Sequence, residues 1–289
     1  MAGLRRSLLI AITVAIVLMI AGGDRTVQAM NANAPHGFDA RWMMPDAQIH
    51  PLPEALAQWH DLAQSGDYFD EISPTSAGYL IWPRFPIRVF IESAATPETS
   101  SPQVGASVLQ RWHNAVVQGV DAWSTYLPIQ YVTTAPEADI KIWASAPPLR
   151  YSSNGEIERA RSAETRYSLY TSATPILDVA AENLELEQDV LQERPQLLPA
   201  CEIWLSPGQS DQHIAATARH EMGHALGIWG HSPTASDTLY FAQVRSPQPI
   251  SPRDINTLKR IYEQPTQIGW PWVLRPTETN NADPLVPKG

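Results

Sequence analysis

The chain has 289 residues, a hydrophobic fraction of 44% and a formal net charge of -10. This length and composition can fill the core of a full domain. An acidic protein without clusters of basic residues repels nucleic acid and anionic membrane surfaces, so no nucleic-acid partner is expected. The single cysteine, Cys201, excludes an intramolecular disulfide. Its apolar surroundings favour a buried, inert thiol, and zinc ligation by Cys201 is the alternative.

Residues 1–29 are typical of a secretory signal peptide. Arg5 and Arg6 precede an apolar run from Leu8 to Ile20, and Val27–Ala29 fits the small-x-small rule for cleavage after residue 29. The apolar run is shorter than the ~20 residues that span a bilayer, which argues against the alternative of a retained membrane anchor. We therefore expect a secreted or periplasmic protein, without a stable membrane partner once the signal is removed.

Residues 30–77 are rich in proline and methionine and lack strong periodicity, except over Pro53–Ser65. There Pro53 suits a first helical turn, and Leu56, Trp59 and Leu62 are spaced for one face of a helix. We interpret residues 30–77 as a strap that leans on the main domain, or as a removable pro-segment.

The main domain is predicted over residues 78–263, followed by an extended tail over residues 264–289. Alternating apolar residues predict strands over Ile87–Ile91, Ile129–Thr134, Ala138–Ser145, Thr165–Thr171 and Cys201–Gly208. Helical spacing predicts helices over Ser107–Tyr126, over the acidic stretch Glu182–Arg194, and over Ser251–Tyr262 with a capping box. The order of strand, helix, strand and strand is typical of an α/β sandwich on a twisted sheet.

The stretch RHEMGHALGIWGHS, Arg219–Ser232, is predicted to lie on and beyond a helix capped by Ser210 or Asp211. Residues four apart on a helix point to nearly the same side, so His220 and His224 can bind one metal ion. Glu221 lies about 100° round the helix, where it can accept a proton from a water on that metal. The apolar flanks predict a buried helix. Because burying these polar groups without a partner is costly, a zinc site is favoured over two solvent-facing histidines.

A catalytic zinc needs three protein ligands and one open position. Gly227 can adopt the left-handed conformation that ends a helix and turns the chain back toward the metal. His231 is the expected third ligand, and Asp237 and Glu263 are the alternatives.

This stretch resembles the matrixin branch of the metzincin zinc proteases, whose pattern is H-E-x-x-H-x-x-G-x-x-H followed by Ser. Residues of the same type stand at His220, Glu221, His224, Gly227 and His231-Ser232. One extra residue separates Gly227 from His231, because Gly230 occupies the place of the third histidine. A bulge is inexpensive at a conformationally free glycine. Leu239-Tyr240 stands where the family has a methionine-bearing turn beneath the zinc, and leucine can supply the same apolar floor.

The likeness covers Tyr79–Tyr262 patchily and fails over Ala146–Pro199. It implies an α+β, zincin-like fold with a twisted mixed β-sheet, an active-site helix and a C-terminal helix. In matrixins the region that corresponds to residues 146–199 carries a second zinc and calcium loops. No matching stretch is present between residues 146 and 199, so neither is expected. The sequence also lacks a cysteine-bearing propeptide motif, so latency through a thiolate is not expected.

The resemblance implies a zinc-dependent endopeptidase in which His220, His224 and His231 bind Zn²⁺ and Glu221 is the general base. We expect a monomer that binds a protein or peptide substrate in extended conformation beside an edge strand upstream of the active helix. The alternatives are a non-catalytic zinc-binding module and a zinc hydrolase of cell-wall peptides. Four other residues are interpreted as structural: His113, His213, Trp229 and Tyr240.

Overall fold

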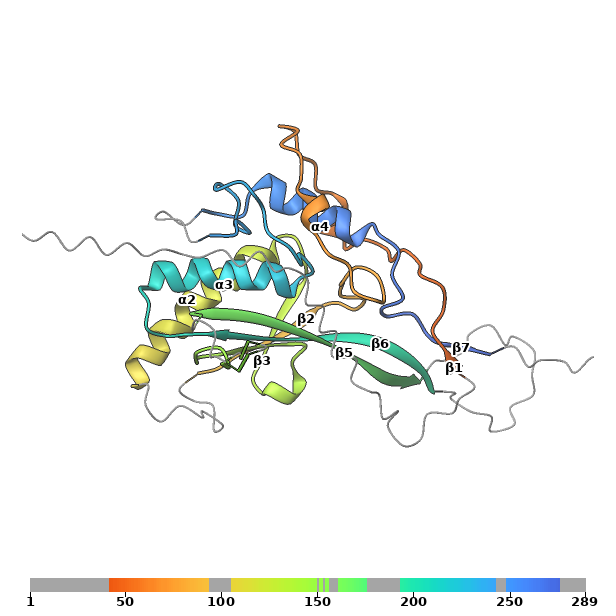
Figure 1. Cartoon of the computed structure of the whole chain (residues 1–289), viewed down its shortest axis with the longest axis horizontal. Helices are drawn as coiled ribbons and strands as arrows, with labels where there is room; N and C mark the ends of the chain where they lie inside the picture. The colour runs from red at the N-terminus through yellow and green to blue at the C-terminus, as the bar shows by residue number, and fades with distance from the viewer. Residues whose placement is uncertain are drawn as a thin grey trace, which may run out of the picture.

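A computed structural model describes residues 42–93, 105–149, 151–152, 154–155, 161–175, 193–242 and 248–275 (Figure 1). The predicted signal peptide lies outside the described residues, as do residues 182–192 of the predicted acidic helix and the end of the tail. Within these described ranges, no helix has the length and apolar character needed to cross a bilayer.

A five-stranded mixed sheet, in the order β3-β2-β4-β6-β5, forms the centre of the molecule. Its parallel strands are β2 (Ile87–Ile91), β3 (Ile129–Val132), β4 (Ile140–Trp143) and β6 (Glu193–Leu205). Strand β5 (Ala163–Pro175) is antiparallel to β6 and forms one edge. A 3-10 turn, η2 (Ala135–Glu137), connects β3 to β4. The predicted α+β class with a mixed sheet is confirmed.

Strands β5 and β6 are longer than predicted, because they pair over 13 residues each, from Ala163 opposite Leu205 to Pro175 opposite Glu193. The helix predicted over Glu182–Arg194 is therefore wrong at its C-terminal end, where Glu193 and Arg194 belong to β6. Pro195 follows directly. A proline disfavours helical conformation at the residue before it, and here the extended conformation prevails.

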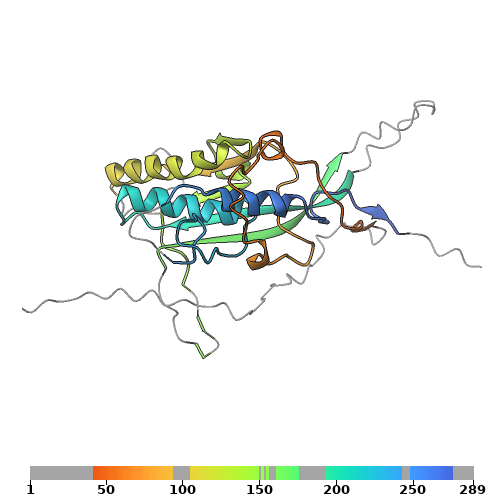
Figure 2. The ribbon, with the colours of Figure 1, turned by 90° about the horizontal axis from the view of Figure 1, so that it is seen from above.

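Two helices, α2 (Ala106–Ser124) and α3 (Asp211–Ala225), lie side by side on one face of the sheet (Figures 1 and 2). The spacing that predicted the first of them is confirmed, since Trp112, Val116 and Trp123 are fully buried. The helices approach closely at Gly119. A Cβ there would lie 2.6 Å from the carbonyl oxygen of Ala215, so glycine permits the contact that sets α3 against α2.

Helix α4 (Pro252–Tyr262) begins with the predicted capping box. The Ser251 hydroxyl accepts from the Asp254 N–H at 3.1 Å, and the Asp254 carboxylate accepts from the Ser251 N–H at 2.8 Å. Together these bonds satisfy N–H groups that a helix start leaves unpaired. Its apolar face is fully buried through Ile255, Leu258 and Ile261.

The two flanks of the described chain lie side by side (Figure 1). Strand β1 (Trp42–Met43) pairs antiparallel with β7 (Val273–Leu274), and Gln48 bridges to Thr266. The predicted extended tail therefore contains a short strand that returns to the start of the strap.

The helix predicted over Pro53–Ser65 is wrong beyond its first turn. Helix α1 spans only Glu54–Ala57, and Leu62, predicted on the buried face, is 96% exposed. The Asp61 carboxylate accepts from the N–H groups of Ala63 and Ser65 at 3.1 and 2.6 Å. Such local side-chain bonds compete with helical hydrogen bonding, and they win here. A second short element of the strap is the 3-10 turn η1 (Phe69–Glu71).

Candidate metal centre

Three histidines gather at the end of α3 and in the loop beyond it. One ring nitrogen from each of His220, His224 and His231 lies within 4.8 Å of the other two. The Nε2 atoms of His220 and His224 are 3.1 Å apart. Two nitrogens that bind one tetrahedral zinc at ~2.0–2.1 Å are separated by about 3.3 Å. The predicted triad is thus brought together, and its donor set fits a metal ion.

Backbone carbonyls orient two of these rings. Nδ1 of His220 lies 2.8 Å from the oxygen of Thr238, and Nδ1 of His224 lies 2.7 Å from the oxygen of Ile228. A neutral imidazole that donates from Nδ1 keeps Nε2 as an acceptor, so the two Nε2 lone pairs face each other. A cation between the two rings would be coordinated by both lone pairs, which would remove their mutual repulsion. Outer hydrogen bonds of this kind are typical of metal-binding histidines.

The surroundings favour the uncharged form of two of the rings. Burial, followed by repulsion from His220 and His231, holds the pKa of His224 well below its usual value. His231 keeps an exposed face, but desolvation by its neighbours and then repulsion from His220 lower its pKa to about 4. Since metal ions bind the neutral imidazole, these histidines are in the form that binds.

The predicted left-handed turn at Gly227 is confirmed, with φ of 125°. The N–H of Ile228 bonds the carbonyl of Gly223 at 3.0 Å, and the N–H of Gly227 bonds that of His224 at 3.0 Å. This pair of bonds is a Schellman motif, which ends the helix. A Cβ on Gly227 would also lie 2.4 Å from the oxygen of Leu80. The turn brings the Ile228 carbonyl to the ring of His224.

Gly230 has a different role from the predicted one. Its φ is not in the left-handed range, so conformational freedom is not what the position requires. A Cβ at Gly230 would lie only 2.0 Å from the carbonyl oxygen of Glu71 in η1. Glycine is needed because η1 passes directly against the loop that connects Gly227 to His231.

Glu221 is buried next to His220 and contacts the edge strand β5. The hydroxyl of Thr165 donates to its Oε2 at 2.6 Å. Burial raises the pKa of Glu221, and the opposing effects of His220 and of the Thr165 hydroxyl are smaller. Within the described ranges, no hydrogen bond engages Oε1. One carboxylate oxygen is therefore fixed and the other is left to accept a proton.

Leu239 packs against α3. It is fully buried, and a Cβ on Gly223, between the two helical histidines, would lie 2.6 Å from its Cδ2. The Asp254 carboxylate accepts from the N–H groups of Thr238 and Leu239 at 2.9 and 3.3 Å. This carboxylate therefore fixes the turn whose Thr238 carbonyl holds His220.

The alternative ligands have other partners or lie apart from the triad. Asp237 accepts from the Ser232 hydroxyl and forms an ion pair with Arg253 at 3.0 Å. Glu263 is exposed at the C-cap of α4. Cys201 is buried, with its Sγ 3.7 Å from the carbonyl oxygen of Ala225, and burial raises its pKa. Among the described residues, none of the three belongs to the cluster of side chains that could hold a metal ion.

The residues interpreted as structural also lie in ordinary contacts. Nδ1 of His113 is 3.1 Å from the backbone oxygen of Glu92, and Nδ1 of His213 is 2.8 Å from the Ser210 hydroxyl. The ring of Trp229 stacks on His224 at 5.8 Å and meets Tyr167 of β5 edge-on at 4.6 Å. The ring of Tyr240 packs against Phe241.

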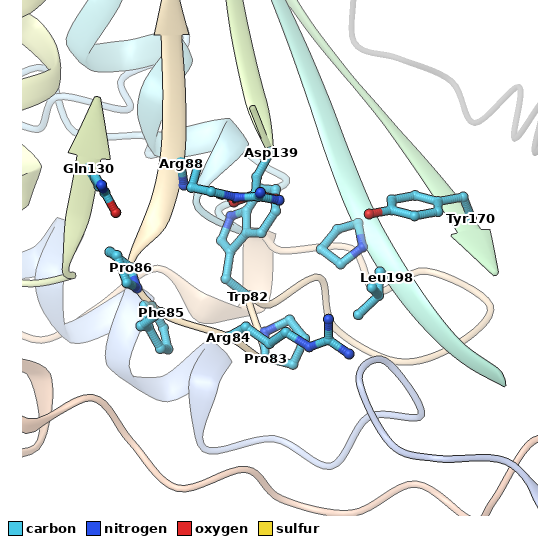
Figure 3. Close-up of a pocket in the computed structure, with 11 residues that line it drawn as sticks. Trp82, Pro83, Arg84, Phe85, Pro86, Arg88, Gln130, Asp139, Tyr170 and Leu198 are labelled. Carbon is cyan, nitrogen blue, oxygen red and sulfur yellow. Dashed lines mark hydrogen bonds and ion pairs between the residues drawn. The ribbon is translucent and has the colours of Figure 1, made fainter. Parts of the chain in front are cut away.

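A separate cavity of about 360 Å³ lies at the amino ends of β2 and β3 (Figure 3). Trp82 and Phe85 line its apolar part. Arg88 and Asp139, which also line it, form an ion pair at 2.7 Å and so neutralise each other. No histidine of the triad lines this cavity, so it is distinct from the metal centre.

No protein-family model matches the chain, and no curated protein matches it either. The histidine cluster and its surroundings, through their chemistry and geometry, are therefore what indicate a function for the chain.

Proposed function

We propose that the chain is a zinc-dependent endopeptidase of metzincin type, which hydrolyses peptide bonds in proteins. One observation carries the proposal: three imidazoles gather at one point, and the buried carboxylate of Glu221 interacts electrostatically with one of them, His220. A purely structural metal site has no use for that carboxylate, and its burial is costly. The mixed sheet, the ligand helix α3 and the closing helix α4 are consistent with a zincin-like fold.

His220, His224 and His231 would hold the zinc. When bound, zinc lowers the pKa of a coordinated water toward ~7 and polarises the scissile carbonyl. Oε1 of Glu221 accepts a proton as the water oxygen bonds to the carbonyl carbon. The same carboxyl then gives that proton to the amine nitrogen as the C–N bond breaks. Thr165 keeps the other oxygen in place throughout.

Strand β5 is the favoured place for the substrate main chain. It is the edge strand beside α3, lies upstream of that helix in sequence, and contacts Glu221 through Thr165. An edge strand offers free N–H and C=O groups with which an extended peptide can pair. Strand β6, in contrast, is paired on both sides.

The test compares the wild-type chain with Glu221→Gln and with a matched control, Glu263→Gln, which removes an exposed carboxylate at the C-cap of α4. Elemental analysis should find zinc in all three proteins. Casein cleavage should fall about 10²–10⁴-fold in Glu221→Gln, the usual contribution of a general base, and should be unchanged in the control. Cleavage at the wild-type rate by Glu221→Gln would remove this residue from the mechanism.

A peptidoglycan digest run beside the casein digest separates the alternatives. A non-catalytic zinc-binding module would bind zinc and cleave neither substrate. A zinc hydrolase of cell-wall peptides would release peptides from peptidoglycan and leave casein intact. The proposed endopeptidase cleaves casein.

A further inference from the structure

His231 differs from the other two ligands in how its ring is held. The rings of His220 and His224 are each anchored through Nδ1 to a backbone carbonyl. In the described part of the chain, no hydrogen bond reaches a ring nitrogen of His231, and the residue is exposed. Its position therefore depends on the backbone of the loop that carries it.

That backbone is braced immediately before His231 by residues 65–73, here named the inner strap. The N–H of Ser73 donates to the carbonyl oxygen of Trp229 at 2.9 Å. A Cβ at Gly230 would lie 2.0 Å from the oxygen of Glu71 and 3.0 Å from Cδ1 of Ile72. The loop and the inner strap are thus in contact with no space for a side chain between them.

A second link reaches the residue immediately after His231. The carbonyl of Ser65, at the start of the inner strap, accepts from Nη1 of Arg253 at 3.2 Å. Nε of the same guanidinium donates to Asp237 at 3.0 Å, and Asp237 in turn accepts from the hydroxyl of Ser232. The loop is therefore linked to the inner strap on both sides of His231, through Trp229 before it and through Ser232 after it.

The inner strap is itself firmly fixed to α4. The hydroxyl of Tyr68 donates to Asp254 at 2.6 Å, and its N–H donates to the hydroxyl of Thr257 at 3.0 Å. The side chains of Tyr68 and Ile72 are only 4% and 6% exposed. A segment with such burial can transmit its position to the loop that it touches.

We propose that the inner strap is a permanent part of the metal centre, which positions His231 as the third ligand. This inference rests on the proposed zinc site, and it assigns residues 65–73 to the working protein rather than to a removable pro-segment. A chain that lost these residues would keep the two helical ligands and lose the fixed position of the third.

The experiment measures zinc affinity of the full chain by competition with a chromophoric chelator. Gly230→Ala forces a methyl group against Glu71, and Ile72→Ala removes the strap side chain that touches Gly230. Groups that orient a metal ligand typically contribute 10–100-fold to affinity, so we expect a loss of that order in Gly230→Ala and of about tenfold in Ile72→Ala. The Co²⁺-substituted proteins should show the absorption change of a lost nitrogen ligand.

Two controls make the same chemical changes away from the loop. Gly208→Ala places its methyl in open space, and Ile87→Ala truncates a fully buried isoleucine of β2. Both should keep wild-type zinc affinity, although Ile87→Ala lowers the melting temperature. If Gly230→Ala does not fold, Ile72→Ala decides, and Ile72→Val provides a milder truncation.

The outcomes separate this inference from the function on which it rests. A wild-type chain that binds no zinc overturns both. Zinc binding by the wild type with unchanged affinity in both loop-facing variants overturns only the role of the inner strap. Mass spectrometry of the purified, zinc-loaded protein gives an independent result. Its N-terminus should precede Ser65, and a zinc-binding form that begins after Ser73 would contradict the proposal.

Discussion

Thr165→Val tests the hydrogen bond that links the edge strand to Glu221. Valine keeps the shape of threonine and removes the hydroxyl that donates to Oε2 at 2.6 Å. Glu221 is only 9% exposed, so water does not easily replace the lost donor. A hydrogen bond to a charged group contributes about 1.5–3 kcal/mol, against about 0.5–1.5 kcal/mol between neutral groups.

Urea unfolding at neutral pH should show this difference. In the wild-type background Thr165→Val should lower the free energy of unfolding by about 1.5–3 kcal/mol, and in the Glu221→Gln background by about 0.5–1.5 kcal/mol. If the carboxylate also loses its orientation, a loss of about 1.5–3 kcal/mol in the transition state lowers kcat roughly 10- to 150-fold. Thr165→Ser keeps the hydroxyl and should retain activity.

Thr171→Val makes the same change on the same strand, away from Glu221, and should have little effect on either quantity. Equal losses of stability in the wild-type and Glu221→Gln backgrounds would show that the hydroxyl does not stabilise an ionised carboxylate. Thr165 would then not be the residue that orients Glu221.

Three further outcomes are expected. Leu239→Ala should lower the free energy of unfolding by about 2.7–5 kcal/mol, and Leu239→Met should lower it by less than about 1.5 kcal/mol. If calorimetry finds the same loss in both variants, Leu239 is not closely packed on Gly223. Gly119→Ala should lower the free energy of unfolding in urea by about 1–3 kcal/mol, because its Cβ would overlap the carbonyl oxygen of Ala215. An unchanged free energy would mean that α2 and α3 can move apart at this position without loss of stability. Zinc at a hundred times its Kd should raise the free energy of unfolding by about 2.7 kcal/mol, and a melting temperature insensitive to zinc and to chelator would contradict the metal site.

Local patterns in the sequence predicted the elements whose formation depends on near neighbours. Alternation over Ile87–Ile91 predicted a strand, and Ser251 with Asp254 predicted a capped helix; both are present. The Pro53–Ser65 helix failed because the side chain of Asp61 offers its backbone neighbours another partner. The full length of β6 was also missed, since Pro195 and Pro199 obscure the strand pattern that pairing with β5 sustains.

The approach of two of the three histidines was predictable for a similar reason: the spacing of His220 and His224 is a property of one helix. The groups around them were not. Alternation predicts a strand at Thr165 but not which helix residue its hydroxyl meets. The contact of Glu71 with Gly230 joins segments far apart in the chain, and a glycine that lacks space for a Cβ looks the same in sequence as one that needs a left-handed backbone.

The meeting of the two flanks of the chain has a consequence for biosynthesis. Strands β1 and β7 pair, and Asp254 of α4 holds both Tyr68 and the turn at Thr238. A growing polypeptide that has emerged only as far as the histidines therefore lacks the helix that fastens their surroundings. The hydrolase proposed here would therefore acquire its activity only after α4 has emerged from the ribosome.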